Sequence, residues 1–225
     1  MSHDDPALQT LVERVKSAQT ACTPLCIQGG GTKRFYGEAP QGELLDTRAL
    51  QGISSYEPTE LVVTARCGTP LAELEATLAE KGQCLPFEPP HFGPGSTVGG
   101  MVAAGLSGPA RAASGAVRDF VLGATLLNGR AGVLSFGGQV MKNVAGYDVS
   151  RLLAGSLGTL GVILEVSLKV LPVAPATATL RFAMDEATAI RRLNEWGGRP
   201  LPINASAWWD GTLLLRLRGA LAAVN

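Results

Sequence analysis

The stretch GPGSTVGGMVAAG (residues 93–105) decides how this chain is interpreted. It lies in a segment, residues 86–118, that is rich in Gly, Pro, Ala and Ser and carries few large side chains. A linker is one interpretation of such a composition. The run TVGGMVAAGL is apolar and compact, however, and therefore predicts a short buried helix that packs tightly against another part of the protein.

Earlier in the chain, a glycine run in CIQGGGTKR (residues 26–34) follows directly after a short apolar stretch that predicts a strand. In chain order this run is the first glycine loop, and residues 93–105 form the second. Consecutive glycines expose backbone N–H groups and can form a concave set of donors for a phosphate or diphosphate. Thr32 adds a hydroxyl group and Lys33 adds a positive charge. Taken alone, the run is more typical of a tight turn that binds nothing.

Two common nucleotide-binding motifs are missing around these glycines. The P-loop pattern GxxxxGK[ST] is absent because Lys33 is followed by Arg34, and no GxGxxG is followed directly by a helix. Two further glycine-containing stretches, SGAVRD (114–119) and GSLGTLGVI (155–163), bring the number of such loops to four. Four separated loops of this kind indicate a long, partly charged ligand, and a dinucleotide has that shape.

Hydrophobic periodicity predicts mixed α+β structure around these loops. Helices are expected over residues 4–20 and 69–82, the second with Thr69 as its N-cap, Pro70 in its first turn and Gly82 at its end. Strands are expected within 24–28, 43–50 and 52–68. A hairpin is expected over 119–138, turning near Asn128-Gly129, and a helix, a glycine turn and a long strand over 147–172.

The composition changes after Pro172, and residues 174–225 predict a second unit. It consists of a strand (176–184), a helix capped by Asp185 and ended by Gly197, and a hairpin around Asp210-Gly211. These elements form part of a ferredoxin-like α+β unit that is too short to cover both faces of its sheet. On the hairpin, alternation predicts one buried ring and one exposed ring for Trp208 and Trp209. Arg216 and Arg218 share one face, for which solvent is favoured over a substrate carboxylate.

Composition excludes several classes of function. Hydrophobic residues make up 46% of the 225 residues and charged residues 17%, so a sizeable core is expected. Lys+Arg and Asp+Glu both number 19, which argues against a nucleic-acid-binding protein. Four scattered cysteines and two histidines lack the spacing of a metal site, so no metal is expected. The polar N-terminus and the lack of a long apolar run predict a cytoplasmic protein without a signal peptide.

In their order and spacing, GGGTK, GSTVGGMVAAG, GAVRDFVLGATLLNG and KNVAGYDVSRLLAGSLGTLGVI resemble the FAD-binding domain of the vanillyl-alcohol-oxidase type, also called the PCMH type. The resemblance covers residues 20–175 and is greatest to the FAD-binding accessory subunits of bacterial three-subunit glycolate oxidases. It implies two α+β subdomains that hold FAD between them. We therefore expect a PCMH-type FAD-binding domain over 1–173, followed by an incomplete ferredoxin-like cap over 174–225.

By the same resemblance, the glycine loops become cofactor-binding residues. Many relatives carry a histidine beside the first loop that bonds covalently to flavin. This chain has Thr32-Lys33 there, so FAD is expected to be non-covalent. Met101 and Gly105 stand where relatives often carry Asn, and Ala113-Ser114 stand where many carry Arg-Tyr. The implied cofactor-binding residues are Gly29, Gly30, Gly31, Thr32, Lys33, Gly95, Ser96, Thr97, Val98, Gly99, Gly100, Gly105, Gly115, Ala116, Gly158, Gly161 and Ile163.

The implied function is that of an FAD-binding subunit in a complex that oxidises glycolate, or another small 2-hydroxy acid, to the 2-oxo acid. The implied partners are a catalytic flavoprotein subunit and an iron–sulfur subunit, with at most peripheral membrane attachment through them. A non-catalytic FAD-binding assembly module is an alternative. Another flavoenzyme of the same fold is a further one, such as a D-lactate dehydrogenase or a UDP-sugar reductase.

No catalytic residue is assigned from the sequence. His91, in PPHFGP, lies just before the second glycine loop, where a packed or solvent-facing side chain is more common than a catalytic base. Lys142-Asn143 and Tyr147-Asp148 lie in a stretch similar to the family. Asp148 is equally suited to be the N-cap of the helix that follows it.

Overall fold

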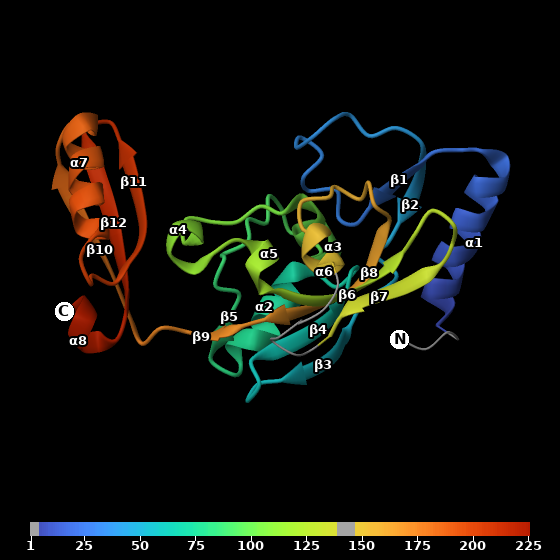
Figure 1. The fold of residues 1–225 in the computed structure, drawn as a ribbon, viewed down its shortest axis with the longest axis horizontal. Coiled ribbons are helices and arrows are strands. Elements are labelled where there is room, and N and C mark those ends of the chain that lie inside the picture. The colour runs from blue at the N-terminus through green and yellow to red at the C-terminus, as the bar shows by residue number, and fades with distance from the viewer. Residues whose placement is uncertain (1–4, 139–146) are drawn as a thin grey trace.

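The computed structural model describes residues 5–138 and 147–225 of the chain. Its N-terminal part consists of helix α1 (Pro6–Ala21) and a parallel pair of strands, β1 (Leu25–Gln28) and β2 (Glu43–Asp46). Asp5 caps α1, because its carboxylate accepts the backbone N–H of Ala7 at 2.9 Å. The face of α1 that carries Leu8, Leu11 and Val15 is buried. These elements form the first small α+β subdomain, at the right of Figure 1.

The second subdomain is built on an antiparallel five-stranded sheet. In spatial order its strands are β3 (Ile53–Glu57), β4 (Val62–Arg66), β8 (Val162–Lys169), β6 (Val121–Leu127) and β7 (Val133–Gly137). The long strand β8 is in the centre and is almost wholly buried. The β6–β7 hairpin, predicted at Asn128-Gly129, is confirmed.

Short helices pack around this sheet. They are α2 (Leu71–Ala79), α3 (Val98–Ala104), α4 (Arg111–Ser114), α5 (Val117–Phe120) and α6 (Val149–Leu152). Helix α3 contacts both β4 and β8, and most of its residues are buried. The prediction of a short buried helix at TVGGMVAAGL is therefore confirmed. The two-residue strands β5 (Gln83–Cys84) and β9 (Leu171–Pro172) pair with each other at one edge of the subdomain.

The predicted cap of α2 is wrong. The N-cap residue is Pro70, which makes no side-chain capping bond. The hydroxyl group of Thr69 instead accepts the backbone N–H of Gly52 at 2.9 Å and donates to the Gly52 carbonyl at 3.1 Å. Because Thr69 is fully buried, its hydroxyl group needs this non-local partner more than α2 needs a cap. Asp148, in contrast, does cap α6 through the N–H of Arg151.

A separate three-stranded sheet forms the C-terminal unit, at the left of Figure 1. Its elements are β10 (Ala176–Ala183), α7 (Glu186–Gly197), β11 (Ile203–Trp209), β12 (Thr212–Gly219) and α8 (Leu221–Val224). The sheet is antiparallel in the order β10-β12-β11, and the hairpin at Asp210-Gly211 is confirmed. The domain boundary at 173/174 stays a prediction, although the chain changes sheets between Pro172 and Ala176.

Helix α7 ends at Gly197, as predicted, with Gly198 as its C-cap. Two other predictions for this unit are wrong in detail. Neither tryptophan is buried, since Trp208 is 38% and Trp209 81% exposed, because α7 covers only part of the sheet. The indole N–H of Trp208 donates to the Met184 carbonyl. Arg216 and Arg218 do not face solvent, because both contact the carboxylate of Glu88 in the preceding unit.

Candidate cofactor cleft

The first two glycine loops meet at a cleft of about 510 Å³ between the two N-terminal subdomains. Strand β1 and the loop after it form one wall, and the start of α3 and the loop after α6 form the other. The lining residues are Leu25, Cys26, Ile27, Gln28, Gly29, Gly30, Gly31, Thr32, Lys33, Arg34, Tyr36, Glu38, Pro40, Gln41, Ser96, Thr97, Gly100, Ala103, Ala104, Leu157, Gly158 and Thr159.

The two loops approach so closely that only glycine fits at their contact. A Cβ atom on Gly30 would lie 1.5 Å from the carbonyl oxygen of Gly95. A Cβ atom on Gly29 would lie 2.3 Å from the hydroxyl oxygen of Thr97. Two of the consecutive glycines are therefore explained by the approach of the second loop, 65 residues further along the chain, and not by a turn alone.

The first loop presents free hydrogen-bond donors to the cleft. Within residues 5–138 and 147–225, the backbone N–H groups of Gly30, Gly31, Thr32 and Lys33 donate to no protein acceptor. Buried or half-buried N–H groups normally find a partner. A row of four unpaired donors in a cleft is suited to a ligand with several anionic oxygens.

Lys33 joins the two loops through its ammonium group. Its Nζ donates to the Ser96 hydroxyl oxygen at 2.8 Å and to the His91 carbonyl oxygen at 3.3 Å. It also lies 5.9 Å from the centre of the Phe92 ring. Partial burial lowers the pKa of Lys33 below its ordinary value. Within the part of the chain that the structure describes, no carboxylate forms an ion pair with this half-buried ammonium group.

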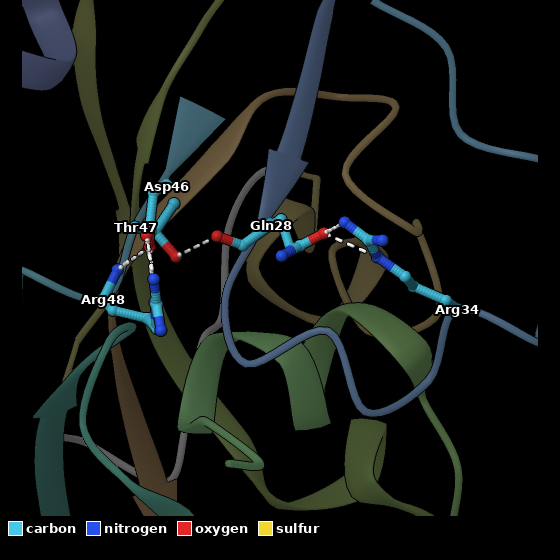
Figure 2. A network of polar contacts seen from close by, with 5 residues as sticks. All are labelled: Gln28, Arg34, Asp46, Thr47 and Arg48. Atoms are coloured by element: carbon cyan, nitrogen blue, oxygen red, sulfur yellow. Dashed lines mark hydrogen bonds and ion pairs between the residues drawn. The ribbon is translucent and has the colours of Figure 1, made fainter. Parts of the chain in front are cut away.

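A polar network holds the end of β1 at the cleft, as Figure 2 shows. The Gln28 carbonyl accepts the N–H of Thr47 at 2.9 Å, and the Gln28 side-chain oxygen accepts Arg34 Nε at 2.8 Å. Beyond Thr47, Arg48 pairs with Asp46 at 2.6 Å and lowers the pKa of that carboxyl group. Sequence analysis missed Gln28 and Arg34. Their position beside the glycine run was the available signal, but their mutual contact depends on the turn between them.

The structure divides the seventeen predicted cofactor-binding residues into nine that line the cleft, two that lie beside it and six that do neither. Nine of them line the cleft: Gly29, Gly30, Gly31, Thr32, Lys33, Ser96, Thr97, Gly100 and Gly158. Gly95 does not line the cleft, but its carbonyl oxygen lies against Gly30. Gly161 borders a smaller hollow of about 210 Å³, which shares Leu25, Ile27, Gly158 and Thr159 with the cleft. The others do not line the cleft: Val98, Gly99, Gly105, Gly115, Ala116 and Ile163.

Most of the six predicted residues that do not line the cleft have backbone N–H groups that already donate within the protein. The N–H of Val98 donates to the Thr69 carbonyl, and that of Gly99 donates to the Cys67 carbonyl at 2.8 Å. Gly115 donates to Arg111, and Ala116 donates to the Asp119 carboxylate at 2.8 Å. These glycine-rich positions are thus explained by protein contacts.

His91 lies outside the cleft. Its imidazole Nε2 is 2.8 Å from a carboxylate oxygen of Glu75 on α2. The His91 side chain therefore makes a structural contact with α2. Lys142 and Asn143 lie outside the described residues. Within the part of the chain that the structure describes, no cluster of three or more His, Cys, Asp or Glu side chains is arranged to hold a metal ion. No helix there has both the length and the apolar character needed to cross a bilayer.

Comparison with known proteins identifies the fold. A family described as "FAD binding domain" matches residues 8–151, which is more than half of the chain and includes the whole first wall of the cleft. The chain belongs to this FAD-binding family. Its cofactor is therefore FAD, and the fold class expected from the sequence, a PCMH-type α+β domain, is confirmed.

Curated relatives narrow the resemblance within the FAD-binding family. Glycolate oxidase subunit GlcE of Escherichia coli (strain K12) is 51% identical over 96% of this chain and 62% of its own length. Glycolate oxidase subunit GlcD of Bacillus subtilis (strain 168) is 30% identical over 70% of this chain and 34% of its own length. The D-lactate dehydrogenase of Archaeoglobus fulgidus is 33% identical over 70% of this chain and 35% of its own length. The chain thus spans about a third to three fifths of the length of these relatives.

A solved structure of alkyldihydroxyacetonephosphate synthase shares the fold of this FAD-binding chain. It superimposes with a TM-score of 0.75 at 20% sequence identity, over 96% of this chain and 46% of that one. The superposed length includes the C-terminal three-stranded unit. At this identity the likeness concerns the fold alone.

Proposed function

We propose that the chain is the FAD-binding part of a complex that oxidises glycolate, or a similar 2-hydroxy acid, to the corresponding 2-oxo acid. The observation that carries this proposal is the 51% identity with the glycolate oxidase subunit, which extends over 96% of the chain and through both units. D-lactate dehydrogenases also match the chain, at the lower identities of 32% and 33%. This match supports the same general chemistry and keeps D-lactate as the alternative substrate.

The cleft fits the diphosphate of FAD. The row of free N–H groups from Gly30 to Lys33 would bind its oxygens, as backbone nests do. Lys33 would supply the positive charge and the Ser96 and Thr97 hydroxyl groups the polar contacts of the second loop. The hollow beside Ile27, Gly158 and Gly161 would receive the adenosine half. Because Thr32 and Lys33 stand where a flavin-linked His would be, we propose that FAD is bound without a covalent bond.

When bound, FAD supplies the acceptor for a hydride from the Cα of the substrate, and the chain supplies binding, orientation and charge. Lys33, which donates to Ser96, would stabilise the negative charge of the cofactor at the junction of the two loops. The glycine contacts hold the loops at a set distance and would keep side chains away from the diphosphate. Among residues 5–138 and 147–225, none is placed as the base that takes the hydroxyl proton, and we propose that a partner subunit supplies it.

The partners we propose are a catalytic flavoprotein subunit and an iron–sulfur subunit that accepts the electrons. The word "subunit" in the names of two relatives supports assembly with other chains. We further propose a cytoplasmic location with at most peripheral membrane attachment through these partners. A non-catalytic FAD-binding assembly module is the second candidate. It is favoured by the partly uncovered C-terminal sheet, which leaves Trp209 81% exposed.

Anaerobic flavin reduction tests this function. We expect the purified chain to carry one FAD, released by acid, because no covalent bond holds it. Glycolate should then bleach the flavin absorbance more than D-lactate does at equal concentration. Bound FAD whose absorbance is bleached by neither glycolate nor D-lactate would support the assembly module. Bleaching by D-lactate alone would support the alternative substrate, and a chain that binds no FAD would contradict the proposal as a whole.

The affinity for FAD is expected to fall with rising pH because of Lys33. Burial lowers the pKa of its ammonium group, and a bound diphosphate favours the protonated form. The contribution of Lys33 to binding is therefore complete below this lowered pKa and is lost as the pH rises through it. Loss of one charge-assisted hydrogen bond, roughly 1.5 kcal/mol, weakens binding about tenfold.

Fluorescence titration with FAD between pH 7 and pH 10 measures this dependence. The Lys33→Arg variant is the matched control, because its guanidinium group stays charged over the whole range and any titration of FAD itself affects both proteins equally. An equal loss of affinity in both proteins would show that Lys33 is not the group responsible.

A further inference from the structure

One carboxylate joins the C-terminal sheet to the FAD-binding unit. Arg216, on β12, donates through one terminal nitrogen to both oxygens of Glu88, at 2.8 and 2.7 Å. Arg218 approaches the same carboxylate at 3.4 Å. Glu88 also accepts the backbone N–H of Ala110 at 3.1 Å. All three charged side chains are 20–27% exposed, so this pair is better shielded from solvent than an ordinary surface ion pair.

The backbone at Glu88 is held in an unusual conformation. Its φ is +48°, which is uncommon for a residue other than glycine and costs of order 1 kcal/mol or more. The preceding carbonyl, of Phe87, accepts the N–H of Gly108 at 2.8 Å, and a Cβ on Gly108 would lie 2.3 Å from the Glu88 carbonyl oxygen. Such a conformation persists only where the surroundings determine it, and the arginine contacts are part of those surroundings.

The segment that starts at Glu88 ends at the cofactor cleft. Pro89 and Pro90 follow directly and make it stiff, since each ring restricts its own φ and the conformation of the preceding residue. The carbonyl of His91 then accepts Lys33 Nζ, and the ring of Phe92 packs against that of Phe35 with centroids 4.9 Å apart. Residues 88–92 therefore contact β12 at one end and the first glycine loop at the other.

We propose that Glu88 is a positioning residue for the cofactor cleft, which it does not itself line. By holding Arg216 and Arg218 it fixes the start of the stiff segment 88–92, and thereby the His91 carbonyl to which Lys33 donates. The orientation of the C-terminal unit and the shape of the cleft are in this way coupled. The part of the inference that concerns cofactor affinity rests on the proposed function, whereas the coupling itself does not.

The test compares Glu88→Gln with wild type in the full chain. Glutamine keeps the size and the acceptor for Ala110 but removes the charge that holds both arginines. We expect the dissociation constant for FAD to rise about fivefold to tenfold. In the cofactor-free protein, we expect backbone hydrogen exchange across residues 91–97 to accelerate at least about fivefold. Arg216→Lys should act in the same direction, because lysine lacks the guanidinium fork.

The matched control is Glu195→Gln, which removes one partner of the exposed Arg192–Glu195 pair on α7 in the same C-terminal unit. It should change neither quantity. The proposal would be overturned if Glu88→Gln and Arg216→Lys lowered the melting temperature but kept both the FAD affinity and the hydrogen exchange of residues 91–97 within twofold of wild type. Glu88 would then be a stabilising contact only. If the wild type binds no FAD, the proposed function fails, and the exchange comparison still decides the coupling.

Discussion

Replacing Gly30 with alanine is expected to weaken the binding of FAD at least about a hundredfold, which corresponds to roughly 2.7 kcal/mol. The added Cβ would lie 1.5 Å from the carbonyl oxygen of Gly95. Because non-bonded carbon and oxygen atoms need about 3.5 Å, the two loops must move apart by about 2 Å. That movement displaces the row of donors from Gly30 to Lys33 and breaks the 2.8 Å contact between Lys33 and Ser96.

The dissociation constant of FAD, measured by fluorescence quenching, checks this prediction. Gly197→Ala is the matched control, because Gly197 lies in α7, outside the cleft and the smaller hollow, and no atom lies within 4 Å of the position of its Cβ. Its affinity should equal that of the wild type. A Gly30→Ala protein that binds FAD within about fivefold of the wild type would show that the diphosphate does not lie at the junction of the loops.

Gly99→Ala is expected to lower the free energy of unfolding by about 2 kcal/mol, within the range of core overpacking. Its Cβ would lie 2.6 Å from the Cβ of Cys67 and 3.0 Å from the Cys67 carbonyl oxygen. The same carbonyl accepts the Gly99 N–H at 2.8 Å, so α3 cannot shift without losing this bond. Cys67 is buried between α3 and the sheet, and burial raises its thiol pKa to about 12, so it remains a neutral packing residue.

Urea denaturation measures this change, with Gly197→Ala as the control. No atom lies within 4 Å of the Cβ position at Gly197, and alanine in a helix is neutral or stabilising by up to about 1 kcal/mol. Where Gly99→Ala is folded, its affinity for FAD should fall much less than that of Gly30→Ala. The reverse pattern, unchanged stability with lost affinity, would place Gly99 against the cofactor.

These two glycines mark how far the sequence could predict the site. Both belong to runs that are typical of a backbone held close to something, and both were predicted to bind the cofactor. The structure shows that Gly30 lines the cleft with its N–H free, whereas the N–H of Gly99 donates to Cys67. A glycine run predicts close approach but does not reveal which surface approaches. That depends on residues 32 to 65 positions away in the sequence.

Charged and aromatic residues of the C-terminal unit show the same limit. Alternation correctly predicted that Arg216 and Arg218 share a face of β12, but their partner, Glu88, lies 128 residues away from Arg216. Alternation also predicted one buried tryptophan, but α7 covers too little of the sheet for that. The pattern of a strand defines its two faces, and the packing of other elements decides what covers each face.

By itself, the sequence determined that this chain has mixed α+β structure, a short buried helix within residues 97–106 and several glycine loops of the kind that accept a dinucleotide. These features are local, because periodicity and missing side chains act on neighbouring residues. Only the tertiary structure decided which loops share a cleft, which N–H groups remain free in it, and that Glu88 holds the second unit to the first. Hydrogen bonds and close contacts between distant segments exist only once the chain has packed.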